Sequence, residues 1–437
     1  MSGGHGHLHG AGADPHVEVG GRARLALVAL LSLAAALTIF GLARNWPDAA
    51  RTAESISATE FAAPGVSFPV GTVTRVLPAC PQTTSGPGQG SAGEGGAPVE
   101  EGTTCGAITV DLKGTPSAPS VSVAVPPAVT ISGLRAGDTV QLMRVPAQAG
   151  APETYSFLQV QRGSPLLLLA IVFLAVVVIV ARARGLLALV GLGFGGFVLI
   201  AFMLPALLEG RSGLLVASLG SSAIMFVVLY LAHGLSIRTS TALAGTLFGV
   251  AITAGLGIVA VGLARLSGVA NDESATLASF VQHMNPRELL TAAIIVAGLG
   301  VLNDVTITQS SAVWELRAAG PQLTRAQLFT SGMRIGRDHI ASTIYTIVFA
   351  YAGAALPVLM LLFLYERPVL DLLQTEALAE EIIRTLASAI GLVLAVPATT
   401  AIAALTVSGP VAPQGSSPEP SGRAPTTRAE ARALRRG

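Results

Sequence analysis

The chain has 437 residues, of which 51% are hydrophobic and 12% are charged, and its net charge is +1. A soluble domain carries about 25% charged residues, so this composition argues against an ordinary soluble protein. The near-zero net charge, with no cluster resembling a basic binding face, argues against a nucleic-acid partner. Several apolar runs exceed the roughly 18 residues that a membrane-spanning helix needs. The sequence therefore predicts an α-helical polytopic membrane protein with the lipid bilayer as its surroundings.

The apolar runs predict about eight transmembrane helices after a disordered tail over residues 1–23. This tail contains four histidines and no cysteine; such histidines can bind Zn, Ni or Cu weakly, but a flexible site loses entropy when it closes, so we predict no metal site and no cofactor. The first apolar run is longer than a signal-peptide core, so we interpret it as an uncleaved anchor. The predicted spans are residues 24–42, 164–181, 185–208, 213–235, 239–264, 289–309, 340–364 and 383–406.

Arginine accumulates in alternate loops. It precedes the first span, lies between the second and third, the fourth and fifth, and the sixth and seventh, and recurs in the tail 409–437. With an even number of spans these segments share one side, which the positive-inside rule assigns to the cytoplasm. We therefore predict a bacterial inner-membrane protein with both termini in the cytoplasm. The tail 409–437 is rich in Pro, Ser and Arg and is predicted to be disordered.

Residues 45–163 form the one long segment outside the predicted spans. Short stretches of alternating apolar and polar residues, punctuated by Gly and Pro, are typical of a small antiparallel sheet or barrel. We expect a small extracytoplasmic β-rich domain inserted after the first helix. Cys80 and Cys105, the only cysteines, both lie in it. That compartment permits a disulfide between them, with two free thiols or a redox pair as the alternatives.

Polar residues recur in the sixth and seventh spans of the remaining membrane domain, residues 164–408. In the sixth span, Asp304 and Thr308 share one helix face, and Asn303 precedes them. A charge at membrane depth costs about 2.5–3.5 kcal/mol, so such residues usually face a bundle interior or a wet cavity. We predict a transport or polar site in a vestibule open to the cytoplasm, formed by Asn303, Asp304, Thr308, Arg334, Arg337, Asp338, His339, Ser342 and His233.

Within this site we assign Asp304 as the proton or cation carrier, with Arg334, Arg337 or His233 as its partner. The alternative is that Asp338 and His339 are interfacial residues at a helix start, where an acid meets the helix dipole favourably. Between the two spans, residues 310–338 form an amphipathic pattern interrupted by Pro321. It predicts a helical hairpin on the inner membrane surface.

The two late segments resemble a known family. Gly298-Leu-Gly-Val-Leu-Asn303-Asp304-Val-Thr-Ile-Thr and Arg334-Ile-Gly-Arg-Asp338-His339-Ile-Ala-Ser342 resemble the signature segments of the YibE/F-like bacterial integral membrane proteins, and the resemblance extends roughly over residues 65–408. The family pattern has Asp where this chain has Asn303, and Asn where it has Tyr345. This chain therefore carries one carboxylate where the pattern has two. The resemblance implies a membrane architecture and implies no substrate.

Three hypotheses for the function follow. The first is a permease or exporter of an unknown small solute or ion that uses Asp304 as its coupling group. The second is a membrane accessory or sensory protein whose extracytoplasmic domain binds an envelope partner. The third, an enzyme, is the weakest, because the chain contains no His-Glu-x-x-His, no Gly-x-Ser-x-Gly and no nucleotide-binding loop. Oligomerisation stays open.

Overall fold

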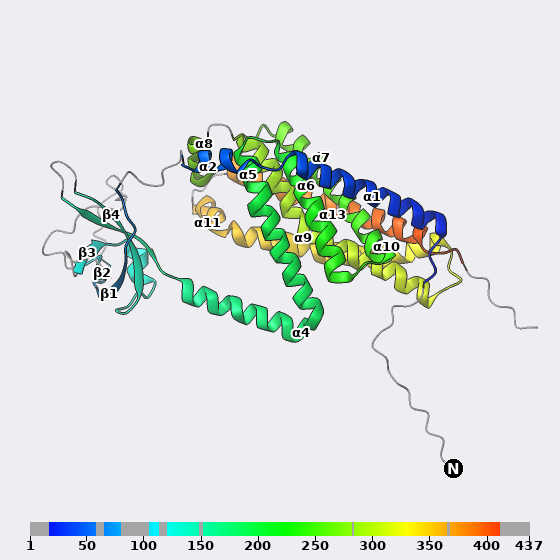
Figure 1. The fold of residues 1–437 in the computed structure, drawn as a ribbon, viewed down its shortest axis with the longest axis horizontal. Coiled ribbons are helices and arrows are strands. Elements are labelled where there is room, and N and C mark those ends of the chain that lie inside the picture. Colours follow the sequence, from blue (N-terminus) through cyan, green and yellow to red (C-terminus); the bar gives the residue numbers. More distant parts are fainter. Residues whose placement is uncertain are drawn as a thin grey trace, which may run out of the picture. The chain divides into compact units, whose positions relative to one another are not determined.

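The computed structural model describes residues 17–57, 65–79, 105–112, 120–147, 152–281, 284–364 and 368–410. It divides into two compact units, one comprising Ile56–Arg182 and the other Met1–Ser55 together with Ala183–Gly437. The first unit is built around a β-sheet, and the second is a helical bundle (Figure 1). The described part of the chain is therefore mostly helical with one small sheet, as the sequence predicts.

The sheet unit contains five antiparallel strands in the order β3-β2-β1-β4-β5. The edge strands β3 and β5 also contact each other, so the sheet is curled. One face is apolar, because alternate residues such as Val73, Val110 and Leu142 point into a common core. Cys105 is disulfide-bonded, whereas Cys80, its predicted partner, lies outside the described residues. The elements are β1 (Val70–Val76), β2 (Ala107–Leu112), β3 (Ser120–Ala124), α3 (Pro127–Ile131), β4 (Thr139–Val145) and β5 (Thr154–Val160).

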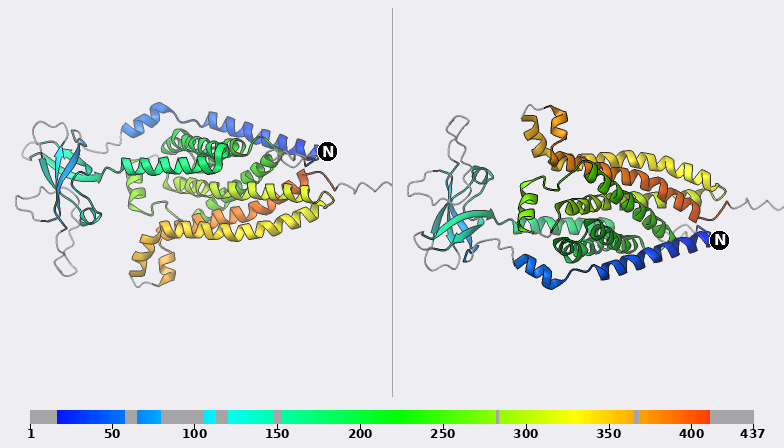
Figure 2. Two further views of the ribbon diagram at one scale, coloured as in Figure 1. Left: turned by 90° about the horizontal axis from the view of Figure 1, so that it is seen from below. Right: turned by 90° about the horizontal axis from the view of Figure 1, so that it is seen from above.

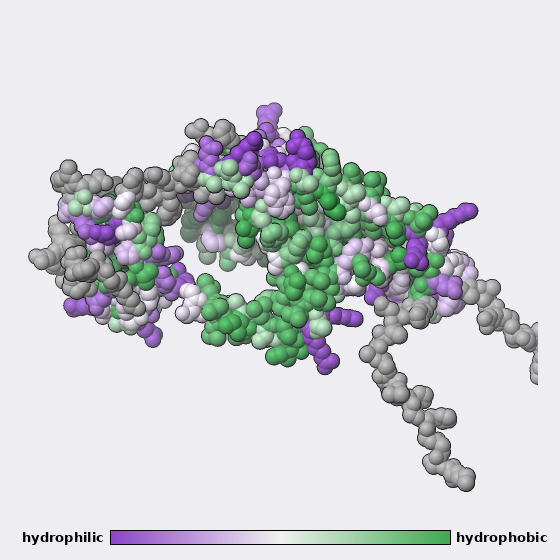
Figure 3. Space-filling view, in the orientation of Figure 1, coloured by the Kyte–Doolittle hydropathy of each residue, from purple (hydrophilic) through white to green (hydrophobic). Residues whose placement is uncertain are grey.

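The bundle is formed by long apolar helices joined by short connections. Figure 2 shows α9, α10 and α13 running alongside one another, and Figure 3 shows apolar side chains over much of the helical surface. The helices outside the sheet are α1 (Gly21–Arg44), α2 (Ala49–Ser57), α4 (Gly163–Val198), the π-helical turn Leu199–Met203, α5 (Leu204–Leu208), α6 (Gly213–His233), α7 (Ile237–Leu263), α8 (Asp272–Phe280), α9 (Pro286–Ala319), α10 (Arg325–Ala354), α11 (Leu356–Leu364), α12 (Val369–Leu373) and α13 (Glu376–Thr406).

Six helices in the described ranges are long and apolar enough to cross a membrane, against the eight spans predicted. The predicted spans 164–181 and 185–208 fall in one helical stretch, Gly163–Leu208, which is interrupted where Arg182 adopts a φ of 54°. The predicted span 340–364 is divided at Ala355 between α10 and α11, just before Pro357. The difference in number thus arises because two predicted spans that meet at the kink at Arg182 count as one stretch, and because one predicted span is divided.

Hydrogen bonds from backbone N–H groups near the helix ends define the two ends of the bundle. The Gly20 N–H donates to the Thr406 carbonyl at 3.0 Å, which places the start of α1 beside the end of α13. We call this the Gly20 end. At the other end, the Asp48 N–H donates to the Glu209 carboxylate at 2.5 Å, and the Gly213 N–H donates to the Glu288 carboxylate at 2.6 Å. The chain segments at residues 17–20 and 406–408 therefore lie at the same end of the bundle.

Helices α7, α9 and α13 pack most closely, and glycine permits this. A Cβ on Gly245 of α7 would lie 1.9 Å from the Thr399 Oγ1 of α13. A Cβ on Gly391 of α13 would lie 2.0 Å from the Thr253 Oγ1 of α7. Only glycine fits such distances without moving a helix. Gly249, one turn after Gly245, also lies close to its neighbours, and this close packing brings the polar side chains of the three helices together.

Candidate functional site

The turn between α9 and α10 determines how these two helices face each other. The Arg317 guanidinium, on a side chain that is buried, donates to the carbonyls of Pro321 and Leu323 at 2.9 and 2.8 Å. Thr324 and Gln327 then form a capping box that starts α10. The segment predicted as a separate hairpin, residues 310–338, consists of the adjoining ends of α9 and α10 with this turn between them.

The turn fixes the register of α10 against α9, and this register brings Asp304 of α9 and His339 of α10 together. The Asp304 Oδ2 and the His339 Nε2 are 3.8 Å apart, which is an ion-pair distance when the imidazole is protonated. His339 is thus the ion-pair partner of Asp304 within the described chain, in place of Arg334, Arg337 or His233. His233 is the last residue of α6 and is exposed.

The Asp304–His339 pair lies well inside the bundle's span. The Ser310 hydroxyl of α9 donates to the Arg238 carbonyl at 2.8 Å, so Ser310 is level with the first charged residue of α7. Asp304 precedes Ser310 by six residues, which corresponds to about 9 Å along a helix that rises 1.5 Å per residue. The pair is therefore about 9 Å along the bundle from the level of Arg238.

Most of the predicted site residues point away from the bundle interior. The Asp304 side chain is 71% exposed and that of His339 is 30% exposed. Asn303 and His339 are intermediate, and each has a buried polar atom (Asn303 Oδ1 and His339 Nε2) with no hydrogen-bond partner among the described residues. The exposed members are His233, Asp304, Thr308, Arg334, Arg337, Asp338 and Ser342.

A second polar face of α9, which the sequence analysis missed, lies inside the bundle. The Gln309 amide is 2% exposed and donates to the Gly332 carbonyl at 2.8 Å and to the Thr400 hydroxyl at 2.7 Å. One turn away, the Thr306 and Thr246 hydroxyls are 2.6 Å apart. The spacing Asn303, Thr306, Ser310 was the available signal, because residues three and four apart share a helix face.

We call the buried polar side chains around Gln309, Thr306 and Thr246 the interior column. Further buried polar atoms extend it toward the end of the bundle opposite the Gly20 end. The hydroxyls of Thr253 and Ser388 are buried, and within the described ranges they have no hydrogen-bond partner. Glu380 of α13 is 9% exposed and its Oε1 also has no hydrogen-bond partner there. An unpaired buried polar atom costs about 1–3 kcal/mol, so its presence calls for a reason beyond packing.

The sheet unit carries a separate ionic cluster on its surface. The Arg144 guanidinium donates to the Glu153 carboxylate at 2.6 Å, and the Tyr155 hydroxyl donates to the same carboxylate. The hydrogen bond from Arg144 lowers the pKa of Glu153, and the same bond raises the pKa of Arg144. Burial, followed by the bond to Glu153, raises the pKa of Tyr155. This cluster ties β4 to the start of β5.

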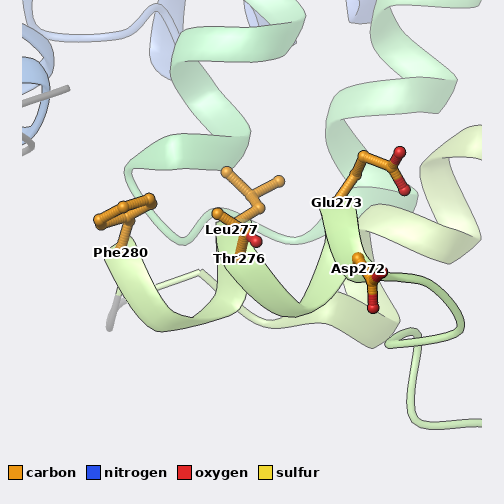
Figure 4. A pocket seen from close by; sticks show the side chains of 5 residues that line it. All are labelled: Asp272, Glu273, Thr276, Leu277 and Phe280. Carbon is orange, nitrogen blue, oxygen red and sulfur yellow. The ribbon is translucent and has the colours of Figure 1, made fainter. Parts of the chain in front are cut away.

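An open depression lies along α8, lined by Asp272, Glu273, Thr276, Leu277 and Phe280 (Figure 4). All five side chains come from one short helix, so no second element contributes a polar group to it. No group of three or more His, Cys, Asp or Glu side chains suited to a metal ion occurs in the part of the chain that the structure describes. The Asp304–His339 pair, between α9 and α10, and the interior column are therefore the candidate polar sites among the described helices.

A family model matches the helical part of the chain. The model of the family described as "YibE/F-like protein" matches residues 169–409. The chain belongs to the YibE/F-like family. The match covers α9, α10 and α13 of this YibE/F-like protein and begins after the last strand of the sheet, so it does not include the part of the resemblance that we placed before residue 169. No curated protein and no solved structure matches the chain.

Proposed function

We propose that this YibE/F-like protein is a permease or exporter-like transporter of a small solute or ion. It would lie in the bacterial inner membrane with both termini in the cytoplasm. The observation that carries the proposal is the Asp304–His339 pair, 3.8 Å apart on adjoining helices and about 9 Å along the bundle from the level of Arg238. Ionisable residues within membrane-spanning segments are expensive and commonly mark ion or substrate pathways.

The pair has the chemistry of a coupling site. A histidine changes charge near neutral pH, and its affinity for a proton responds to a neighbouring carboxylate. A proton or cation that binds Asp304 competes with His339 for the same carboxylate. Binding therefore changes the attraction between α9 and α10, which is the kind of local charge change that biases a conformational equilibrium.

The interior column supports a path next to this pair. The Thr306 hydroxyl donates to the Asn303 carbonyl at 3.2 Å, so the column begins within one turn of Asp304. Two helix irregularities provide places for bending, namely Pro397 inside α13 and the break at Ala355 between α10 and α11. Proline removes a backbone hydrogen bond and weakens the helix locally.

Everted membrane vesicles test the proposal. A pH-sensitive dye reports the proton gradient, and monovalent cations, divalent cations and amino acids are added in turn. We expect at least one solute to dissipate the gradient with the wild-type protein, and Asp304→Asn and His339→Gln to abolish that response at equal membrane abundance. Glu315→Gln, an exposed carboxylate on the same helix, is the matched control and retains the response.

If Asp304→Asn responds like the wild type, the carboxylate is structural and the proposal fails. The accessory or sensory hypothesis then takes its place. That hypothesis predicts that function depends on the sheet unit, so deletion of residues 65–150 abolishes function while Asp304→Asn leaves it intact.

A further inference from the structure

The outer surface of α9 and α10 carries charge where the bundle is otherwise apolar. We define the α9–α10 polar face as the exposed residues Asp304, Thr308, Arg334, Arg337, Asp338 and Ser342. Gln309 of α9 lies beside Gly332 of α10, and Asp304 lies beside His339, so positions on the two antiparallel helices can be compared in depth. Asp338 is next to His339, which is level with Asp304, so Asp304 and Asp338 lie within about 1.5 Å of one another along the bundle axis.

Hydrocarbon is a poor cover for this face. Each acid at membrane depth costs several kcal/mol when it faces lipid. The first part of α4, Leu166–Val180, has an entirely apolar sequence and offers no hydrogen-bonding side chain. The face therefore requires a cover that supplies charges of its own.

We propose that the cover is a second copy of this chain, joined through the α9–α10 polar face in a two-fold symmetric dimer. The face is complementary to itself, because it presents two acids, Asp304 and Asp338, and two arginines, Arg334 and Arg337. In a dimer whose two-fold axis follows the membrane normal, each residue meets partner residues at its own depth. Arg337 precedes His339, which is level with Asp304, by two residues, or about 3 Å. The partner's Arg337 is then placed to pair with Asp304.

The remainder of the face fits the same arrangement. Toward the opposite end of the bundle, α10 exposes Tyr345 (64%) and Phe349 (73%) in line with Ser342. Large aromatic side chains beside a polar patch are typical of protein interfaces. The dimer would thus have a charged half near the Gly20 end and an aromatic half beyond it. This inference does not depend on transport, since the charges need a cover whatever the protein does.

Site-specific photocrosslinking in native membranes tests the dimer. The photoreactive residue benzoylphenylalanine replaces Tyr345 in one variant and Thr308 in another, in cells that carry two differently tagged copies. We expect illumination to shift both variants to the mass of a dimer that contains both tags. Phe248 of α7 is the matched control: it is aromatic, is 44% exposed and lies within two residues of Thr246, which touches Thr306. It should give no dimer.

Charge reversal separates a specific pair from general proximity. Asp304→Arg should abolish the Tyr345 adduct, and adding Arg337→Asp to the same chain should restore it. If neither Tyr345 nor Thr308 gives an adduct that contains both tags, the dimer is overturned. It is also overturned if Phe248 gives the adduct in their place. Because the wild-type charges are retained in the crosslinking variants, their outcome does not depend on how well the charge-reversed chains fold.

Discussion

Replacement of Gly245 by alanine tests the packing that positions the interior column. The added Cβ would lie 1.9 Å from the Thr399 Oγ1 and 2.9 Å from the Thr399 Cβ. Thr399 cannot easily turn away, because its hydroxyl donates to the Ala395 carbonyl at 2.7 Å. Overpacking of this kind costs about 1–3 kcal/mol, and the higher helix propensity of alanine offsets up to about 1 kcal/mol. The expected net loss is about 1–2 kcal/mol.

At about 2–4 °C per kcal/mol, this loss lowers the melting temperature by about 2–8 °C. The assay is thermal unfolding of the detergent-solubilised protein, followed by size-exclusion chromatography. Gly255→Ala on the same helix is the control, because a Cβ there has no neighbour within 4 Å. Thr399→Ala added to Gly245→Ala should recover part of the loss. If Gly245→Ala melts at or above the temperature of Gly255→Ala, the packing argument is refuted.

Two further predictions concern the interior column and the sheet unit. Gln309→Leu removes two hydrogen bonds. At about 0.6 kcal/mol per bond between membrane helices, the loss of stability should be about 1 kcal/mol in the same melting assay. An unchanged melting temperature would contradict the structural role of the interior column. Because the pKa of Glu153 is lowered in the folded state, its contribution to stability is present above its ordinary pKa of 4.5 and is lost as pH falls through the lowered value. Amide hydrogen exchange of β4 and β5, corrected for intrinsic rates, should therefore accelerate on acidification. Glu153→Gln should remove that acceleration. If the acceleration persists in the variant, another group causes it.

Composition and apolar run length predict the membrane architecture of this chain well. Burial in hydrocarbon demands long apolar segments, and these are visible in one sequence. The number of spans is harder to predict, because it depends on how neighbouring segments join. The predicted break between spans 164–181 and 185–208 coincides with the kink at Arg182, whereas Ala355 divides a segment that is apolar throughout.

The candidate site could be predicted only in part. Asp304 and His339 stand out as ionisable residues in or beside apolar runs, but their pairing depends on the register of α9 and α10. The turn held by Arg317 sets that register through contacts that leave no trace in local composition. Helix α9 also has two polar faces, and charge draws attention to the one with Asp304. Packing places the other face, with Gln309, inside the bundle.

The most direct test of the central claim compares the metabolite and metal-ion content of cells. A deletion strain is complemented with the wild type, with Asp304→Asn, with Glu315→Gln or with nothing, at matched expression. We predict that at least one solute shifts in the deletion strain, returns to normal with the wild type and with Glu315→Gln, and stays shifted with Asp304→Asn. A complete return with Asp304→Asn would contradict the claim that this carboxylate carries the coupling ion.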